Sequence, residues 1–196
     1  MVDAEFVVSA VSKQDFPREI IPEVVFAGRS NVGKSSLINR LARKEKLARI
    51  STTPGKTRSI NFYRINRSFF FVDLPGYGFA KAAKSEIRQW KKLIEQYFVQ
   101  RPQIALVIQL VDSRLPPTKL DLQLSEWLDK LGIPRMVVAT KSDKLSHSQC
   151  LSQRQLFSAT FGGQPVIMSS AKTGMGCKDV WKRVLEAISA SRSSNH

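Results

Sequence analysis

The chain has 196 residues, of which 42% are hydrophobic and 24% are charged. These values favour a single globular domain and argue against a disordered or fibrous chain. Its 31 Lys and Arg residues outnumber 16 Asp and Glu residues, which gives a formal net charge of +15. Such a balance favours polyanionic partners such as nucleic acid or anionic lipid. A generally basic proteome or a need for solubility is the alternative explanation.

No apolar run approaches the roughly 18 residues of a membrane span. The longest runs, at 69–72 and 104–108, have the length of strands. Asp3 and Glu5 interrupt the region where a secretory signal would lie. Two cysteines and two histidines are too few for a disulfide framework or a zinc site. We therefore expect a cytoplasmic protein with reduced cysteines and no transmembrane contact.

Strand-like and helix-like periodicities alternate along the chain, which is typical of a mostly parallel α/β sheet covered by helices on both faces. Strands are predicted at 24–27, 60–65, 68–73, 104–111, 136–139 and 165–168, and helices at 37–41, 87–98, 120–131, 149–157 and 180–188. The pair 60–65 and 68–73 is predicted to form a hairpin, which supplies one antiparallel strand. We expect a domain over 23–188, an N-terminal extension over 1–22 with an edge strand at 6–8, and a frayed tail over 189–196.

A phosphate-binding loop is predicted between the first of these strands and its helix. Residues 28–35 read GRSNVGKS, a full match to G-x-x-x-x-G-K-[ST] in the required context. Glycines let the backbone wrap closely around phosphates, and the loop amides and helix N-terminus supply hydrogen-bond donors. Lys34 would lie along the β- and γ-phosphates, and the Ser35 hydroxyl would bind Mg²⁺. The candidate nucleotide contacts are Gly28, Arg29, Ser30, Asn31, Val32, Gly33, Lys34 and Ser35.

A second motif, D-x-x-G, ends the strand at 69–73 and consists of Asp73, Leu74, Pro75 and Gly76. The Asp73 carboxylate can hold Mg²⁺ through water, and the Gly76 amide can bond the γ-phosphate. An Asp before a Pro-Gly turn is also common turn chemistry. Its position downstream of a phosphate loop favours the functional interpretation.

The base is specified by the TKSD sequence at 140–143. Asp143 can accept hydrogen bonds from both guanine N1–H and the exocyclic amino group, and adenine offers no such pair of donors. The sequence therefore favours GTP over ATP. The aliphatic stem of Lys141 would lie along the base, and the loop after the last strand would present amides to the guanine carbonyl oxygen. The candidate contacts are Thr140, Lys141, Ser142, Asp143, Met168, Ser169 and Ser170.

This ordered set of motifs resembles the translation-factor-related P-loop GTPases. AGRSNVGKSS at 27–36, TPGKT at 53–57 and VDLPGYGFAK at 72–81 are similar to bacterial ribosome-biogenesis GTPases of the EngB (YihA/YsxC) type, over about residues 23–185. Most GTPases have Asn at the position of Thr140, whereas the EngB type also has Thr there. The resemblance implies a G domain that binds GTP with Mg²⁺ and hydrolyses it slowly. It further implies a role in assembling the large (50S) ribosomal subunit and, through that role, in cell division and septation.

Two segments are expected to act as switches. In the first, the similarity to TPGKT favours Thr57 over Thr52 or Thr53 as the hydroxyl that reaches Mg²⁺ when the γ-phosphate is present. Further nucleotide contacts are expected from Gly55, Lys56, Thr57, Arg58 and Ser59. The expected magnesium ligands are therefore Ser35 and Thr57, with Asp73 acting through water.

The second switch begins at Tyr77, where Ras-like enzymes carry a water-orienting Gln. We therefore assign no catalytic residue and expect a low intrinsic rate of hydrolysis. Asn31 resembles the Asn of potassium-activated relatives, which makes K⁺ a candidate cofactor. A turn or capping role for Asn31 is the alternative.

Basic residues gather around both switches. Residues 40–67 contain nine Lys and Arg against Glu45 alone, and a second cluster comprises Lys81, Lys84, Arg88, Lys91 and Lys92. Contacts to an RNA backbone would depend steeply on salt and could be gated by the nucleotide. The expected partners are GTP or GDP and the large ribosomal subunit or its rRNA, bound by a monomer. The alternatives are a passive RNA-binding protein that retains a nucleotide, a membrane-surface GTPase, and, for the second cluster, a merely solvated helix face.

Overall fold

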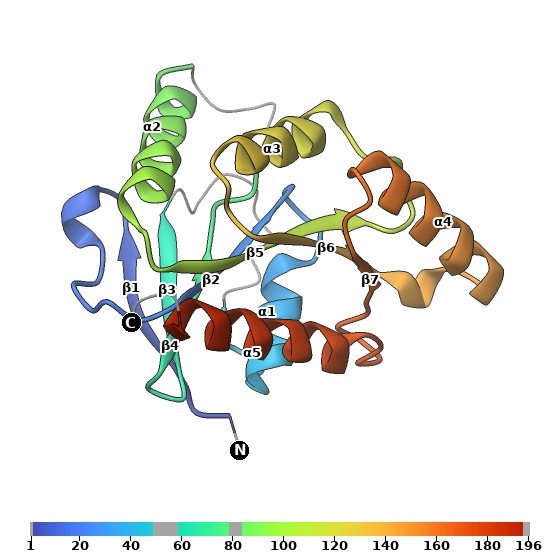
Figure 1. Ribbon diagram of the computed structural model, residues 1–196, viewed down its shortest axis with the longest axis horizontal. Helices are drawn as coiled ribbons and strands as arrows, with labels where there is room; N and C mark the ends of the chain where they lie inside the picture. Colours follow the sequence, from blue (N-terminus) through green and yellow to red (C-terminus); the bar gives the residue numbers. More distant parts are fainter. Residues whose placement is uncertain (1, 49–58, 79–83, 194–196) are drawn as a thin grey trace.

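The computed structural model describes residues 2–48, 59–78 and 84–193. Seven strands among these residues form one sheet in the order β1-β3-β4-β2-β5-β6-β7 (Figure 1). Of these strands, only β3 runs against the others. The predicted α/β class with one antiparallel strand is confirmed. The strands are β1 (Ala4–Ala10), β2 (Glu23–Gly28), β3 (Ile60–Ile65), β4 (Phe69–Asp73), β5 (Ile104–Asp112), β6 (Arg135–Thr140) and β7 (Val166–Met168).

The predicted hairpin joins β3 to β4 through Asn66 and Arg67. Both residues are left-handed, with φ of 49° and 54°, and the Ser68 amide donates to the Ile65 carbonyl at 3.0 Å. Two consecutive left-handed residues are typical of a type I′ turn, whose twist matches that of the strands. Strand β1 pairs with β3 and occupies the edge of the sheet, where the N-terminal edge strand was expected.

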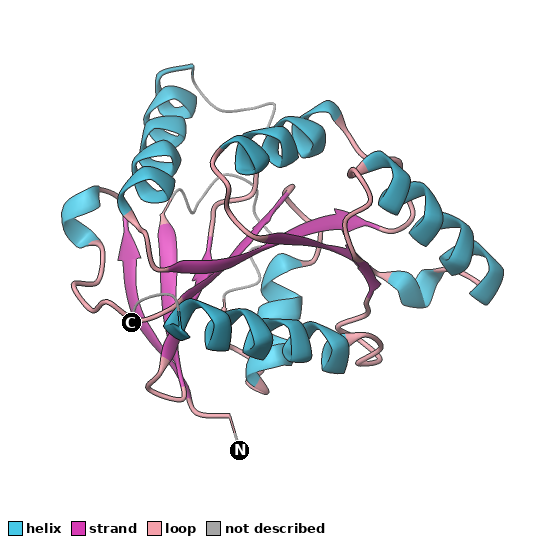
Figure 2. Cartoon of the chain, viewed as in Figure 1, coloured by secondary structure: helices cyan, strands magenta, loops and turns pink. Residues whose placement is uncertain are grey.

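Helices cover both faces of the sheet, with α1 and α5 on one face and α2 and α3 on the other (Figures 1 and 2). Alternate residues of a strand point to opposite faces. Val24 and Phe26 accordingly share a core with helices α1 and α5, whereas Val25 and Ala27 share one with α2 and α3. The described helices are α1 (Lys34–Ala42), α2 (Lys84–Gln100), α3 (Lys119–Lys130), α4 (His147–Thr160) and α5 (Cys177–Ser193).

Local sequence signals set several helix ends. Thr118 and Asp121 form a capping box at the start of α3, and Ser146 and Gln149 form another at α4. Helix α5 continues to Ser193, so residues 189–193 are helical where the sequence predicted a frayed tail. No helix in the described part of the chain is long and apolar enough to cross a bilayer.

A buried ion pair stabilises the end of the sheet opposite the phosphate loop. The side chain of Glu23, at the start of β2, is fully buried and accepts hydrogen bonds from the Arg101 guanidinium and from the Tyr97 hydroxyl at 2.5 Å. Arg101 also donates to the Pro17 carbonyl at 2.8 Å, which fastens the N-terminal segment. Burial raises the pKa of Glu23 even though Arg101 and Tyr97 favour its ionised form. The ion pair with Arg101 thus offsets the free-energy cost of burying this carboxylate.

Replacing Arg101 with Met should leave Glu23 as an unpaired buried carboxylate and lower the free energy of unfolding by about 3–5 kcal/mol. Because burial raises the folded-state pKa of Glu23, stability should fall further as pH rises through that pKa. The loss of stability should become smaller as the pH falls toward about 4.3, the ordinary pKa of glutamate. Urea unfolding across a pH series measures both effects.

Arg135→Met is the matched control, because its partner Asp129 has a side chain 53% exposed and water can solvate that carboxylate once the arginine is gone. Its cost should stay within about 1 kcal/mol. Equal losses in the two variants would contradict the role given to the buried pair.

Candidate nucleotide site

Four loops meet where the parallel strands end. The register pairs Phe26 of β2 with Asp73 of β4, and Ala139 of β6 with Met168 of β7. The phosphate loop, D-x-x-G, T-K-S-D and the Ser169–Ser170 loop therefore begin at neighbouring strand ends. Such an edge is where open α/β sheets bind their ligands.

The phosphate loop has the backbone shape that its glycines predicted. Gly33 has φ of +102° and caps α1. A Cβ on Gly28 would lie 2.9 Å from a methyl carbon of Val32 and 3.0 Å from the Leu110 carbonyl oxygen, so only glycine fits there. Within the described part of the chain, the amides of Gly33, Lys34 and Ser35 donate to no protein acceptor. Free amides at a helix N-terminus suit a phosphate group.

Lys34 and Asp73 form an ion pair at the floor of this loop. Their side chains are only 11% and 8% exposed. Burial raises the pKa of Asp73, and the charge of Lys34 opposes that rise. The Asp73 carboxylate and the Ser35 hydroxyl are the hard oxygen donors that Mg²⁺ prefers, and Mg²⁺ normally takes its remaining ligands from phosphate and water. These two residues therefore fit the ion that P-loop GTPases bind with their nucleotide.

The first switch falls mostly outside the described residues. That range includes Gly55, Lys56, Thr57 and Arg58, so their expected roles stay predictions. Ser59 is buried just before β3, and its hydroxyl donates to the Asn61 side chain at 3.3 Å. The contact that Ser59 was expected to make with nucleotide stays a prediction.

The D-x-x-G motif lies directly against the phosphate loop. Leu74 is buried, and its amide donates to the Phe26 carbonyl at 3.1 Å; Pro75 links it to Gly76. A Cβ on Gly76 would lie 2.9 Å from the backbone of Ser30. The motif thus needs glycine for close packing as well as for any phosphate contact.

Tyr77 is held at both its backbone and its side chain. The Ser30 amide donates to its carbonyl at 3.0 Å, and its own amide donates to the Gly28 carbonyl at 3.2 Å. Its hydroxyl donates to Asp121 of α3 at 2.7 Å. Burial, and then the charge of Asp121, raise the pKa of Tyr77 well above its ordinary value, so the phenol stays neutral. It is engaged with α3 and is not free to orient water.

The two guanine loops are joined to each other. Ser170 donates its hydroxyl to Asp143 at 2.7 Å, and this bond is the largest cause that lowers the pKa of Asp143. The Ser142 amide donates to the Ser169 carbonyl at 3.1 Å. Asp143 is thus kept ionised and held in place with Ser170 as its partner.

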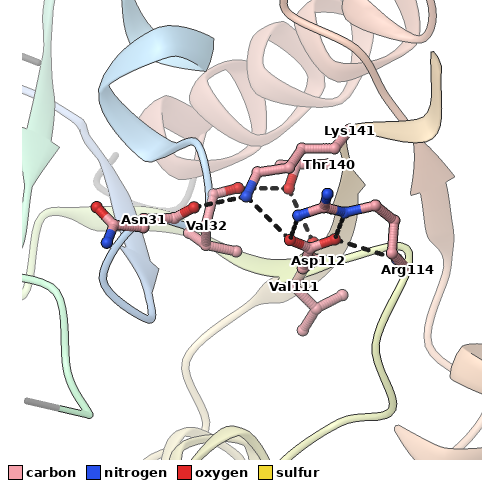
Figure 3. Close-up of polar contacts among 7 residues, drawn as sticks. All are labelled: Asn31, Val32, Val111, Asp112, Arg114, Thr140 and Lys141. Atoms are coloured by element: carbon pink, nitrogen blue, oxygen red, sulfur yellow. Dashed lines mark hydrogen bonds and ion pairs between the residues drawn. The ribbon is translucent and has the colours of Figure 1, made fainter. Parts of the chain in front are cut away.

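Lys141 connects the guanine motif to the phosphate loop. Its ammonium donates to the Asn31 carbonyl at 2.7 Å and to Asp112 at 2.9 Å (Figure 3). The Thr140 hydroxyl lies within hydrogen-bonding distance of the Val32 carbonyl at 2.5 Å and the Val111 carbonyl at 3.0 Å, and its one hydrogen is available to either. Thr140 thereby links β6 to the phosphate loop or to β5. The position that carries Asn in most GTPases therefore has a structural role here that a hydroxyl can fill.

Asp112 and Arg114 are further candidate site residues, which the sequence reasoning missed. Asp112 ends β5 and accepts two hydrogen bonds from the Arg114 guanidinium, at 2.9 and 2.8 Å. Burial raises the pKa of the Asp112 carboxyl, but the bonds from Arg114 and Lys141 outweigh it and hold that pKa well below its usual range. A carboxylate at the end of a buried strand was the signal that identified Asp73, and the same signal marks Asp112.

The fold and this arrangement of loops define a P-loop GTPase. A family model described as "50S ribosome-binding GTPase" matches residues 23–141. The probable GTP-binding protein EngB of Pelotomaculum thermopropionicum is 48% identical over 182 residues, which cover 91% of each chain. That of Heliobacterium modesticaldum is 48% identical over 181 residues, or 91% of this chain and 88% of the relative. A crystal structure of a probable GTP-binding protein engB matches with a TM-score of 0.72 and 26% identity, covering 86% of this chain and 99% of the other. The chain belongs to the EngB family of GTP-binding proteins.

Replacing Asp112 with Asn should weaken GDP binding about tenfold without unfolding the protein. The change removes the charge that holds Lys141 in place, and a hydrogen bond to a charged group contributes about 1.5–3 kcal/mol. Titration with a fluorescent GDP analogue measures the affinity. Asp129→Asn, which removes a carboxylate from the pair with Arg135, is the control and should leave the affinity unchanged.

Replacing Asp143 with Asn should lower guanine affinity and favour xanthine, whose 2-position carries an oxygen in place of the amino group. Ser170→Ala should also lower affinity while keeping the preference for guanine, because Ser170 holds Asp143 but is not the group expected to read the base. Competition with GTP, XTP and ATP separates the two outcomes. An unmodified protein that binds ATP as well as GTP would disprove the role given to Asp143.

Proposed function

We propose that this GTPase is a nucleotide-controlled factor for assembly of the large ribosomal subunit in the cytoplasm, with any effect on cell division and septation following from that role. The carrying observation is that a guanine-nucleotide site occurs in a chain of net charge +15, with basic segments at 40–67 and 81–92 on both sides of the D-x-x-G motif. RNA is the polyanion that such charge would meet on a ribosomal particle. The description of the matching family as ribosome-binding supports this choice of partner.

The site residues divide the work of nucleotide binding. Lys34 and the free amides of the phosphate loop would bind the phosphates, and Ser35 and Asp73 would hold Mg²⁺, with Thr57 joining when the γ-phosphate is present. Bound Mg²⁺ would neutralise phosphate charge. Asp143, with Lys141 beside it, would select guanine.

Hydrolysis should be slow in the isolated protein. The side chain of Tyr77 lacks the carboxamide with which glutamine orients water, and its phenol is bonded to Asp121. Potassium is the candidate additional cofactor, through the exposed side chain of Asn31. Faster hydrolysis on a ribosomal particle would follow if the partner repositions Tyr77 or supplies a group of its own.

A co-sedimentation experiment tests the switch. The full chain should bind large-subunit particles more tightly with a non-hydrolysable GTP analogue than with GDP, and salt should weaken the binding steeply. The double variant Lys56→Ala, Arg58→Ala should lose most of the extra affinity of the GTP-analogue state, because these charges lie beside the Mg²⁺-sensing Thr57. The control is Lys130→Ala, Arg154→Ala, which removes the same charge from exposed positions on α3 and α4.

Equal binding in both nucleotide states would leave the passive RNA-binding alternative. If the Lys56→Ala, Arg58→Ala variant loses binding to anionic vesicles but keeps its binding to particles, the result favours the membrane-surface alternative instead.

A further inference from the structure

An open groove of about 1290 Å³ lies between α1 and α5, beside the guanine loop. One acidic side chain, Glu45, lies among the described residues that line it. All six basic side chains that line it are exposed: Arg40, Arg43, Lys44, Lys172, Lys178 and Lys182. Folding therefore brings three cations from the first basic segment next to three from the C-terminal quarter of the chain.

Two other cations of the first basic segment, Arg64 and Arg67, already have acidic partners. Arg64 forms ion pairs with Glu5 and Glu19, and Arg67 lies 3.9 Å from Asp3. By contrast, no ion pair in the described part of the chain involves Arg43, Lys172, Lys178 or Lys182. Four cations without a described ion pair thus lie together in the groove.

Helical spacing places the α5 cations on the groove side. Lys178 and Lys182 are four residues apart, as are their apolar neighbours Trp181 and Leu185, and residues so spaced share a helix face. All four line the groove. Arg183 does not line it and pairs instead with Glu186. The groove wall is therefore basic along more than one turn of α5.

The walls are preformed. The Trp181 indole N–H donates to the Leu41 carbonyl at 3.1 Å and joins α5 to α1. The Asn39 side chain accepts from the Ala48 amide at 2.6 Å and donates to its carbonyl at 2.9 Å, which fixes the chain after α1. Most of the described residues that line the groove belong to α1, to α5 or to the turns that adjoin these helices. The described walls of the groove thus lie on packed helices.

The shape and charge favour a polymer of phosphates. Small-molecule pockets measure about 300–1,000 Å³, and this groove is larger and open to solvent. Membrane-surface helices present a strip of large apolar side chains, whereas Leu185 is the one large hydrophobic residue that is exposed on the described part of α5. A projecting phosphodiester backbone can enter a concave basic surface that a flat bilayer would only span.

We propose that the α1–α5 groove binds the phosphodiester backbone of RNA equally well in the GDP and GTP states. The choice of RNA as the partner rests on the proposed function. It assigns nucleotide-independent affinity to the groove and leaves nucleotide-dependent affinity to the switch segments. Preformed walls reduce the entropy lost on binding, so such a surface can hold RNA whichever nucleotide is bound.

The test is anisotropy of a labelled RNA hairpin bound to the full chain, across a salt series and with GDP or a non-hydrolysable GTP analogue. Lys178→Ala, Lys182→Ala should weaken binding in both states alike and lower the slope of log affinity against log salt by about 1 for each cation removed. GDP affinity and thermal melting should not change, because both side chains are exposed. The control Lys130→Ala, Arg154→Ala should retain wild-type binding.

Several outcomes would overturn the inference: an unchanged slope, a loss confined to one nucleotide state, or an equal loss in the control. Loss of binding to phosphatidylglycerol vesicles or to an acidic peptide, with RNA binding intact, would assign the groove to that partner instead. If the groove variant loses hairpin affinity as expected but wild-type protein binds particles equally in both nucleotide states, the groove stands and the proposed switch fails.

Discussion

Parallel pairing of β4, β2, β5, β6 and β7 is the constraint on which the site depends. Parallel neighbours require crossover connections, and those connections place helices on both faces and all the carboxyl strand ends on one edge. Four loops that are far apart in the sequence therefore begin at neighbouring strand ends. The buried pair of Glu23 and Arg101 secures the opposite end of β2, so the strand that leads into the phosphate loop is fixed at both ends.

Polar contacts then turn neighbouring loops into one site. Lys141 lies between a carbonyl of the phosphate loop and the Asp112 carboxylate, and Thr140 bonds the same loop from β6. Charge-assisted hydrogen bonds in a partly buried setting are stronger than neutral ones. The T-K-S-D loop and the phosphate loop are consequently fixed relative to each other before any ligand binds.

Much of this could be predicted from the sequence, because the signals are local. The phosphate loop, the Asn66–Arg67 hairpin and the strand and helix types each follow from residues within one short window. The Asp112–Lys141 contact joins residues 29 apart and depends on the pairing of β5 with β6. The groove likewise joins α1 to α5, and the bond from Tyr77 to Asp121 crosses from a loop to α3. No periodicity encodes such contacts, since packing of distant segments creates them.

Tyr77 gives the molecule a mechanical linkage between its phosphate end and α3. Any displacement of the D-x-x-G segment must stretch either two main-chain bonds to the phosphate loop or the phenol bond to Asp121. A hydrogen bond to a charged group contributes about 1.5–3 kcal/mol of free energy. Asp121 is itself buried, at 3% exposed, and is bonded to Thr118 at the start of α3. Movement of the loop would therefore pull on the N-terminus of α3, on the face opposite the basic groove. A partner held in the proposed groove would thus leave the α3 face, where such movement would register, uncovered.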